Sequence, residues 1–567
     1  MTEFVKLTPS VAANYLDGYR GFNKISEAIV KKYFGLLGFF LIILLSSFQQ
    51  NAMALDNGVA QKPPMGWNSW NKFGCNISEN IVKGIADAMA AKGGLAEAGY
   101  DYVVVDDCWM ASNRDAQGQL YGDPVRFPSG MKALADYVHS KGLKFGLYES
   151  PTQGTCQRRP GSYKHEATDA ATFASWGVDY LKLDWCQTST DQSPQMWKDF
   201  PNKSEKEIAQ TLFTKMRDAL AATKRPIGYS LSACCSALDF PSWAGNVANL
   251  WRTSTDITDS WGSVIYNFSK AAPLQSAAGP GKWNDPDMLE IGNGGMTATE
   301  YSAHFGLWAM LAAPLIAGND VRSMDSVTSA TLSNHDVIAV DQDVLGVPAD
   351  VISNIATGVI LSRPLANGDR AIAFLNASNT PATMSTTLQA VGLPVAGTAM
   401  LKDLKTGATL GISGQITETI PAHGLTMYRA TSTIPPLPGA TELVSKSSGR
   451  CLDVSGASNI SGTKMIIWDC HGAGNQQFVG TANNELRLSS DTSMCVDIPE
   501  NSANGSSIQI SKCDLSQHQQ FNRLSNGAYQ GVQSGLCLDV KGGISTGGTD
   551  VIAYSCNGNG NQTWTRR

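Results

Sequence analysis

Strand-like apolar runs alternate with longer helical stretches between residues 59 and 345, and this alternation restricts the fold more than any other feature of the chain. It predicts parallel βα units. Eight such units predict a (β/α)₈ barrel, whose functional residues follow the carboxyl ends of the strands. Polar or ionisable residues end most of the eight runs, which are MGWNSW (65–70), YVVVDDCW (102–109), FGLYES (145–150), YLKLDWC (180–186), IGYSLS (227–232), NLWRTSTD (249–256), KWNDPDM (282–288) and PLIAGND (314–320).

Two aspartates stand at the ends of predicted strands, Asp184 in YLKLDWC and Asp256 in NLWRTSTD. Because the strand ends of a barrel meet on one face, we expect the two carboxyl groups to face one pocket. Hydrolysis of a glycosidic bond needs two carboxyl groups, one to attack the sugar carbon and one to protonate the leaving oxygen. The sequence therefore predicts a sugar-cleaving enzyme.

The length and charge of the chain limit its organisation and its partners. A chain of 567 residues exceeds what one hydrophobic core organises and corresponds to about three or four domains. The net charge of −6 gives no basic surface for nucleic acid or for an anionic membrane. We therefore expect a neutral ligand and no nucleic-acid partner.

The first 54 residues differ from the rest. Lys31 and Lys32 precede the apolar run FGLLGFFLIILLSS (34–47), which is followed by AMA (52–54). This pattern predicts a signal peptide over residues 1–54 with a long n-region, and hence a secreted or periplasmic protein without a membrane partner after cleavage. The alternative is an uncleaved anchor, although the run is shorter than the roughly 20 residues of a spanning helix.

The C-terminal part contains a threefold repeat. The twelve cysteines form an even set, which in an oxidising compartment favours disulfides. Six of them give three evenly spaced pairs, and the repeated motifs are CLDV, CVDI and CLDV, followed by NQQF, HQQF and NQTW. No single repeat is large enough to bury its own core, so three must pack around a shared axis. The predicted pairs are Cys451–Cys470, Cys495–Cys513 and Cys537–Cys556.

The three repeats, over residues 440–567, resemble the ricin-B type β-trefoil lectin module, carbohydrate-binding module family 13. In that family a lobe holds a sugar between an Asp, an aromatic ring and an amide. The second lobe keeps Asp497 but has Ser511 and His518 at the ring and amide positions, so we expect no sugar there. The alternative is that these residues only stabilise the trefoil core. The resemblance implies sugar-binding residues at Asp453, Trp468 and Asn475 in the first lobe and at Asp539, Tyr554 and Asn561 in the third.

Residues 346–430 show short alternating runs, such as GVILSRPL (358–365) and RAIAFLN (370–376). This pattern predicts a small antiparallel β-sandwich. It contains no cluster of acids, histidines or cysteines, so we expect a packing domain. The Pro-rich stretch at residues 431–439 predicts a stiff linker to the trefoil.

Five motifs in the barrel region, PPMGWNSW, DDCW, KLDWC, WRTSTDI and GPGKWNDPDML, occur in one order over about 290 residues. Together they resemble the retaining α-galactosidases and α-N-acetylgalactosaminidases of glycoside hydrolase family 27, in which a barrel precedes a β-sandwich. The resemblance implies that Asp184 is the nucleophile and Asp256 the acid/base, with no metal or cofactor. It implies substrate-binding residues at Trp70, Asp106, Asp107, Tyr148, Cys156, Lys182, Ser232, Arg252 and Asp287, and disulfides Cys75–Cys108 and Cys156–Cys186.

The charged residues of these motifs suggest individual roles. Lys182 lies two residues before Asp184 and thus on the same face of the strand, so its charge should keep Asp184 ionised. Arg252 leads to Asp256 and is expected to order the nucleophile or a sugar hydroxyl. Asp106 and Asp107 are expected to accept hydrogen bonds from the O6 and O4 hydroxyls of galactose.

The substrate is expected to be an oligo- or polysaccharide that carries α-galactosides. An α-galactosidase fits best, and a β-L-arabinopyranosidase and an α-N-acetylgalactosaminidase are the alternatives on the same scaffold. The motif YSLSACC (229–235) does not decide whether the sugar carries a hydroxyl or an acetamide at its 2-position, because Ser232 occurs without the rest of the N-acetylgalactosaminidase motif. Cys234 and Cys235 form either a vicinal disulfide or two free thiols. A noncatalytic galactose-binding lectin is the alternative from a different class.

Overall fold

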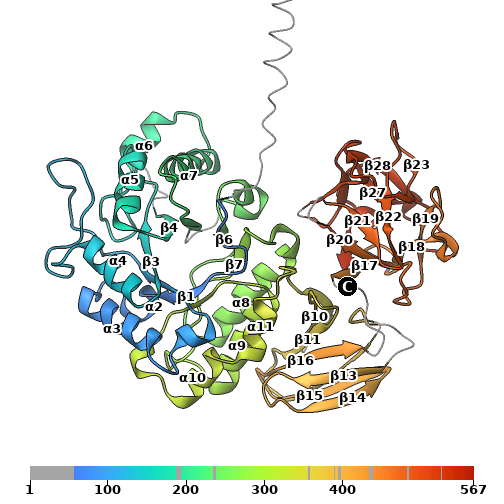
Figure 1. Cartoon of the computed structure of the whole chain (residues 1–567), viewed down its shortest axis with the longest axis horizontal. Helices are drawn as coiled ribbons and strands as arrows, with labels where there is room; N and C mark the ends of the chain where they lie inside the picture. The colour runs from blue at the N-terminus through green and yellow to red at the C-terminus, as the bar shows by residue number, and fades with distance from the viewer. Residues whose placement is uncertain are drawn as a thin grey trace, which may run out of the picture. The chain divides into compact units, whose positions relative to one another are not determined.

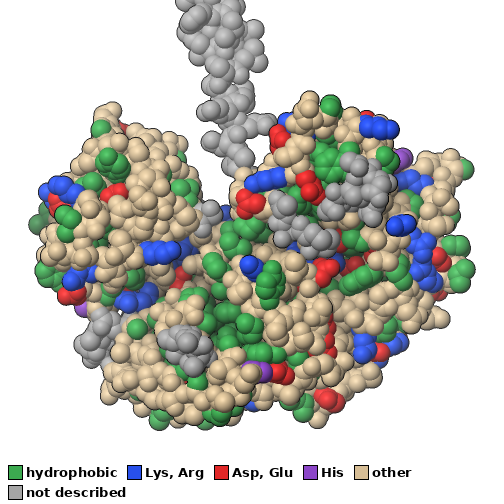
Figure 2. Space-filling model, turned by 180° about the vertical axis from the view of Figure 1, so that it is seen from behind, with side chains coloured by type: hydrophobic (Ala, Val, Ile, Leu, Met, Phe, Trp, Pro, Cys, Tyr) green, Lys and Arg blue, Asp and Glu red, His purple; other side chains and the backbone are tan. Residues whose placement is uncertain are grey.

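The computed structural model describes residues 57–186, 193–233, 238–355, 358–388, 390–393, 398–432, 439–481, 484–524 and 526–567. The predicted signal peptide and the Cys234–Cys235 pair lie outside these residues. None of the helices in the described ranges combines the length and the hydropathy that a membrane crossing needs. On the face shown in Figure 2, basic side chains of the described residues are spread among acidic ones and do not gather in one area.

Eight parallel strands form the predicted barrel (Figure 1), in the order β7-β6-β5-β4-β3-β2-β1-β8. The seam between β7 and β8 is joined by a parallel bridge between Leu289 and Ala317. Gly66 allows β1 to approach β2, because a Cβ at this position would lie 2.5 Å from the carbonyl oxygen of Tyr102. The strands are β1 (Met65–Asn68), β2 (Tyr102–Val105), β3 (Lys144–Glu149), β4 (Tyr180–Trp185), β5 (Gly228–Ala233), β6 (Leu250–Arg252), β7 (Trp283–Asp285) and β8 (Leu315–Ala317).

Amphipathic helices cover the barrel. In α3 the buried residues Val82, Ile85, Ala86 and Met89 follow a helical repeat and so form one apolar face. Helix α7 begins with a capping box between Ser204 and the residue three positions later, Glu207. The helices are α2 (Trp70–Phe73), α3 (Glu79–Ala90), α4 (Met131–Ser140), α5 (Glu166–Trp176), α6 (Pro194–Asp199), α7 (Glu205–Ala222), α8 (Trp261–Ala271), α9 (Ala298–Met310), α10 (Ser326–Leu332) and α11 (His335–Asp341).

The predicted β-sandwich consists of antiparallel sheets of order β14-β13-β16-β11-β10-β9 and β12-β15. The strand β16 continues through Thr431 and Ser432, which pair with β13, so the predicted linker boundary at residue 431 is wrong by two residues. The strands are β9 (Asp350–Ile355), β10 (Gly358–Pro364), β11 (Arg370–Asn376), β12 (Ala382–Thr387), β13 (Thr398–Asp403), β14 (Thr409–Ser413), β15 (Gln415–Ile420) and β16 (Leu425–Ser432).

Short antiparallel strands around one apolar core make up the C-terminal domain, as the threefold repeat predicts. The order of barrel, sandwich and trefoil is therefore confirmed. The strands are β17 (Ala440–Ser445), β18 (Cys451–Val454), β19 (Met465–Trp468), β20 (Gln477–Gly480), β21 (Leu486–Leu488), β22 (Asp491–Asp497), β23 (Ser506–Ser507), β24 (Gln509–Lys512), β25 (Phe521–Arg523), β26 (Tyr529–Gly531), β27 (Leu536–Val540), β28 (Val551–Ser555) and β29 (Trp564–Arg566).

Candidate active site

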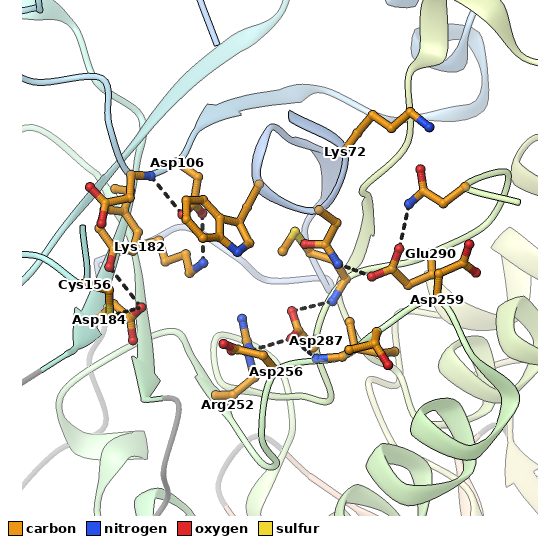
Figure 3. A pocket seen from close by; sticks show the side chains of 18 residues that line it. Lys72, Asp106, Cys156, Lys182, Asp184, Arg252, Asp256, Asp259, Asp287 and Glu290 are labelled. Carbon is orange, nitrogen blue, oxygen red and sulfur yellow. Dashed lines mark hydrogen bonds and ion pairs between the residues drawn. The ribbon is translucent and has the colours of Figure 1, made fainter. Parts of the chain in front are cut away.

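A pocket of about 510 Å³ opens among the segments that follow the barrel strands (Figure 3). Ser232 does not line it: this residue is the register neighbour of Asp184 on β5, but its side chain is buried. All the other predicted site residues of the barrel are brought together here, namely Trp70, Asp106, Asp107, Tyr148, Cys156, Lys182, Asp184, Arg252, Asp256 and Asp287.

Asp184 stands near the end of β4 and is held in place by a tyrosine. Its Oδ2 accepts a hydrogen bond from the Tyr148 hydroxyl at 3.0 Å, and the Sγ of Cys156 lies 3.7 Å from the same oxygen. Burial raises the pKa of Asp184 above its usual value, and the charge of Asp256 adds to this rise, whereas Lys182 opposes it. The nucleophile candidate is thus a carboxylate in a partly desolvated position.

Lys182 does not pair with Asp184. Its ammonium donates to Oδ2 of Asp106 at 2.8 Å and lies 5.2 Å from the centre of the Tyr148 ring. The expectation that Lys182 keeps Asp184 ionised is therefore only partly right, because its charge lowers the pKa of Asp184 but burial outweighs it. The direct partner of Lys182 comes from β2, two strands away, which the spacing of residues within β4 cannot indicate.

The two adjacent aspartates after β2 have different surroundings. Asp106 accepts hydrogen bonds from Lys182 and from Asn68, each at 2.8 Å. Asp107 accepts from the hydroxyl of Thr155 and the backbone N–H of Gln157, each at 2.9 Å. Burial raises the pKa of Asp107 to about 6. Asp107 therefore fixes the loop that carries Cys156, in addition to lining the pocket.

Arg252 connects the second candidate catalytic residue to a buried acid. Its Nη1 donates to Oδ1 of Asp256 at 3.0 Å and to Oδ2 of Asp287 at 2.6 Å. The side chain of Asp256 remains 61% exposed, whereas Asp287 is buried and its pKa rises to about 6. Arg252 thus forms its direct bond with the acid/base candidate, whereas its charge acts on the nucleophile candidate only by lowering the pKa of Asp184. The expectation that Arg252 binds a sugar hydroxyl stays a prediction.

The pocket also contains residues that the sequence analysis missed. Burial raises the pKa of Glu290 to about 7, and this carboxyl accepts from Asn71 and Asn293. Asp259 accepts from the hydroxyl of Tyr301 at 2.9 Å. Two of them had a sequence signal, because Asp259 and Glu290 each lie three residues beyond a predicted site aspartate. The missed lining residues are Asn71, Lys72, Ile257, Thr258, Asp259, Met288, Glu290 and Asn293.

Five disulfides join the cysteine pairs that were predicted. Cys156–Cys186 lies in the pocket region, where the Tyr148 hydroxyl is 3.0 Å from the Sγ of Cys186. This bond therefore holds the loop after β3 against the end of β4. The other four are Cys75–Cys108, Cys451–Cys470, Cys495–Cys513 and Cys537–Cys556.

The first lobe of the trefoil combines a fixed carboxylate with an exposed ring. Asp453 accepts from Asn475 at 3.1 Å and from Gln476 at 2.6 Å. Burial raises the pKa of Asp453. The ring of Trp468 remains 45% exposed, which is unusual for so large an apolar side chain and suits stacking on a sugar.

The third lobe repeats this arrangement. Asp539 accepts from Asn561 at 2.9 Å and from Gln562 at 2.7 Å, and Tyr554 is 42% exposed. The second lobe differs, because Nδ1 of His518 lies 2.9 Å from Oδ1 of Asp497 and fills the amide position. The second lobe thus keeps the carboxylate but pairs it with an imidazole.

A (β/α)₈ barrel with two strand-end carboxyl groups in one polar pocket that is large enough for a sugar defines a glycoside hydrolase. Three family models match the chain in the same order as its domains. They are described as alpha galactosidase A, at residues 62–343, alpha galactosidase C-terminal beta sandwich domain, at residues 357–430, and ricin-type beta-trefoil lectin domain, at residues 439–565.

Known proteins resemble the barrel and sandwich. An alpha-galactosidase of Cyamopsis tetragonoloba is 44% identical over 66% of this chain and 87% of its own length. The crystal structure of alpha-galactosidase I from Mortierella vinacea superposes with a TM-score of 0.62, at 35% identity, over 66% of this chain and 98% of that one. A GH27 β-L-arabinopyranosidase from Geobacillus stearothermophilus gives a TM-score of 0.58 at 26% identity, over 66% of this chain and 97% of that one. The chain belongs to the α-galactosidase family of glycoside hydrolases, family 27, and is a hydrolase of the α-galactosidase type.

Proposed function

We propose that this protein removes terminal α-D-galactosyl residues from oligo- or polysaccharides by double displacement, with retention of configuration. The observation that carries the proposal is that Asp184, on β4, and Asp256, after β6, line one pocket. The charge of Asp256 also raises the pKa of Asp184, as expected of two acids that share a site. The alpha-galactosidases among the relatives support the choice of sugar.

In the first step, Asp184 attacks the anomeric carbon and forms a glycosyl ester, while Asp256 protonates the leaving oxygen. In the second step, Asp256 takes a proton from the water that hydrolyses the ester. Retention requires the two carboxyl groups to stand about 5 to 5.5 Å apart, so that no water fits opposite the leaving group. The guanidinium of Arg252, 3.0 Å from Asp256, stabilises the carboxylate that remains after proton donation.

Galactose fits the polar groups that line the pocket. Asp106 and Asp107 both line it and offer carboxylate oxygens to O6 and O4. A β-L-arabinopyranoside lacks the CH₂OH group that Asp106 would bind, which ranks it second. An N-acetylgalactosaminide ranks third, because Ser232 is buried and does not line the pocket.

A comparison of three aryl glycosides tests this proposal. We expect kcat/KM to be highest on p-nitrophenyl α-D-galactopyranoside, and lower on the β-L-arabinopyranoside and on the α-N-acetylgalactosaminide. The Asp184→Asn variant should lose turnover on all three. Sugar binding without turnover on any of the three would instead make the protein a noncatalytic lectin.

We further propose that the trefoil anchors the enzyme on a galactose-containing polymer through its first and third lobes. Two weak sites on one module raise retention through effective concentration. The double variant Trp468→Ala/Tyr554→Ala should lose binding to an insoluble galactan in a pull-down assay. Its control is Ser511→Ala, at the ring position of the second lobe. Unchanged binding by the double variant would contradict the anchoring role.

We also propose that the protein is exported from the cytoplasm, because five disulfides suit an oxidising compartment. N-terminal sequencing of the exported protein should find Leu55 as its first residue, as cleavage after Ala54 requires. A protein that retains residues 34–47 would contradict cleavage.

A further inference from the structure

The pocket is larger than one galactosyl residue needs. A hexose has about twelve heavy atoms, which would fill about 360 Å³ even if each took up the roughly 30 Å³ of a water molecule in the liquid. The pocket measures about 510 Å³. Lys72, Asp259 and Glu290 stand on the opposite side of the pocket from Asp184 and Cys156 (Figure 3), so a galactosyl residue bound next to Asp184 leaves space beside them.

The position of Asp256 indicates which part of the substrate lies beside Lys72, Asp259 and Glu290. Asp256 lies between Asp184 and Asp259 in the pocket (Figure 3). The acid must contact the glycosidic oxygen, so the leaving group lies beyond that oxygen as seen from the nucleophile. The residues past Asp256 therefore meet the leaving group, not the galactosyl residue.

The side chains at this end suit sugar hydroxyl groups. Lys72 is exposed and its charge helps to lower the pKa of Asp320, but its ammonium makes no hydrogen bond or ion pair within the described part of the chain, so its N–H donors are available. Asp259 is held by the Tyr301 hydroxyl and by the backbone N–H of Gly295, which fixes its carboxylate as an acceptor. The charge of Asp259 balances that of Lys72, and burial raises the pKa of Glu290 to about 7, so this end of the pocket carries little net charge and a neutral sugar is the matching ligand.

A second pocket extends this region. It measures about 350 Å³ and shares Lys72 with the first. Glu290 and Asn293 line the first pocket, whereas Ile291, Gly292 and Gly294 line the second, so the two cavities flank one short segment after β7. Lys72 is thus the residue at which a leaving group longer than one sugar would pass from the first pocket toward the second.

We propose that Lys72, Asp259 and Glu290 form a leaving-group subsite that binds a neutral sugar residue. Longer leaving groups continue past Lys72 into the second pocket. This inference rests on the hydrolase function proposed above. It makes the natural substrate an α-galactosyl oligosaccharide or a polymer side chain, whose leaving group carries hydroxyl groups.

The test compares kcat/KM on the α-1,6-linked disaccharide melibiose with kcat/KM on p-nitrophenyl α-galactoside, whose leaving group carries no sugar hydroxyl groups. Lys72→Ala should lower the ratio of the two values about tenfold, mainly through KM for melibiose, because hydrogen bonds to a charged group are lost. Lys72→Arg, which keeps the donors, should restore most of the ratio. Asp259→Asn should lower it in the same direction.

The matched control is Lys132→Ala, an exposed lysine on α4 that pairs with Asp136 and does not line either pocket. It should leave the ratio unchanged. A Lys72→Ala ratio equal to that of the wild type, or an equal loss on both substrates, would overturn the subsite while leaving the hydrolase function intact. Absence of turnover of both substrates by the wild type would overturn the hydrolase function and the subsite together.

Discussion

The hydroxyl of Tyr148 donates a hydrogen bond to Oδ2 of Asp184 over 3.0 Å. Tyr148 is buried, and burial raises its pKa well above the usual value, so it remains a donor throughout the working range of an enzyme. A neutral donor of this kind stabilises the ionised form of Asp184 without neutralising its charge. Tyr148 thus offsets part of the rise in pKa that burial imposes on the nucleophile candidate.

Replacing Tyr148 by Phe should move the acid limb of the pH profile. Attack requires ionised Asp184, so activity is lost as the pH falls through its pKa. Loss of the hydrogen bond raises that pKa further, and the acid limb of kcat/KM on an aryl galactoside should shift upward by about one pH unit. The control is Tyr137→Phe, whose hydroxyl donates to Asp87 outside the pocket. An unchanged or lower midpoint would contradict this role.

Replacing Arg252 by Lys should impair both activity and stability. One ammonium cannot reproduce the two bonds from Arg252 to Asp256 and Asp287. We expect kcat/KM to fall at least about tenfold and the free energy of unfolding to fall by about 2 kcal/mol, because a buried carboxyl group loses a partner. Kinetics and urea denaturation measure the two effects. Arg217→Lys, at a half-buried position on α7 that does not line the pocket, should leave kcat/KM unchanged, and an Arg252→Lys variant with wild-type values would refute the bridging role.

The disulfide Cys156–Cys186 should matter for activity, and the trefoil disulfide Cys537–Cys556 should not. Serine at both positions of either pair should lower stability by about 2–4 kcal/mol. Only loss of the first pair frees the loop that lies 3.7 Å from Asp184, so only this variant should lose most of its turnover of the aryl galactoside. Equal activity of the two double variants, measured while both remain folded, would show that the active-site disulfide does not position the nucleophile.

The barrel was predictable because its strands are short apolar runs that end in polar motifs, as KLDWC illustrates. Short apolar runs that alternate with helical stretches indicate βαβ units and a parallel sheet. The trefoil was predictable because the cysteine spacing repeats with the motifs around it. In both cases the signal is local, or periodic along the chain.

The individual partners of the site were not predictable to the same degree. Lys182 has a carboxylate two positions away in sequence, yet it pairs with Asp106, because the barrel brings the end of β2 closer to its ammonium. Likewise Ser232 is the register neighbour of Asp184 but is buried outside the pocket lining. Lys72 and Glu290 come from segments on either side of the barrel seam. Contacts between residues of different strands depend on how the strand ends converge in the barrel, and the spacing of residues within one motif does not indicate this.

The stereochemistry of the first product tests the central claim most directly. If Asp184 forms a glycosyl ester that water then hydrolyses, proton NMR during early turnover of an α-galactoside should show α-galactose first, with β-galactose appearing only as the sugar mutarotates. Initial release of β-galactose would mean direct attack by water. It would place the two carboxyl groups at the wider spacing of inverting enzymes, about 6.5 to 9.5 Å, and would contradict the role of Asp184 as nucleophile.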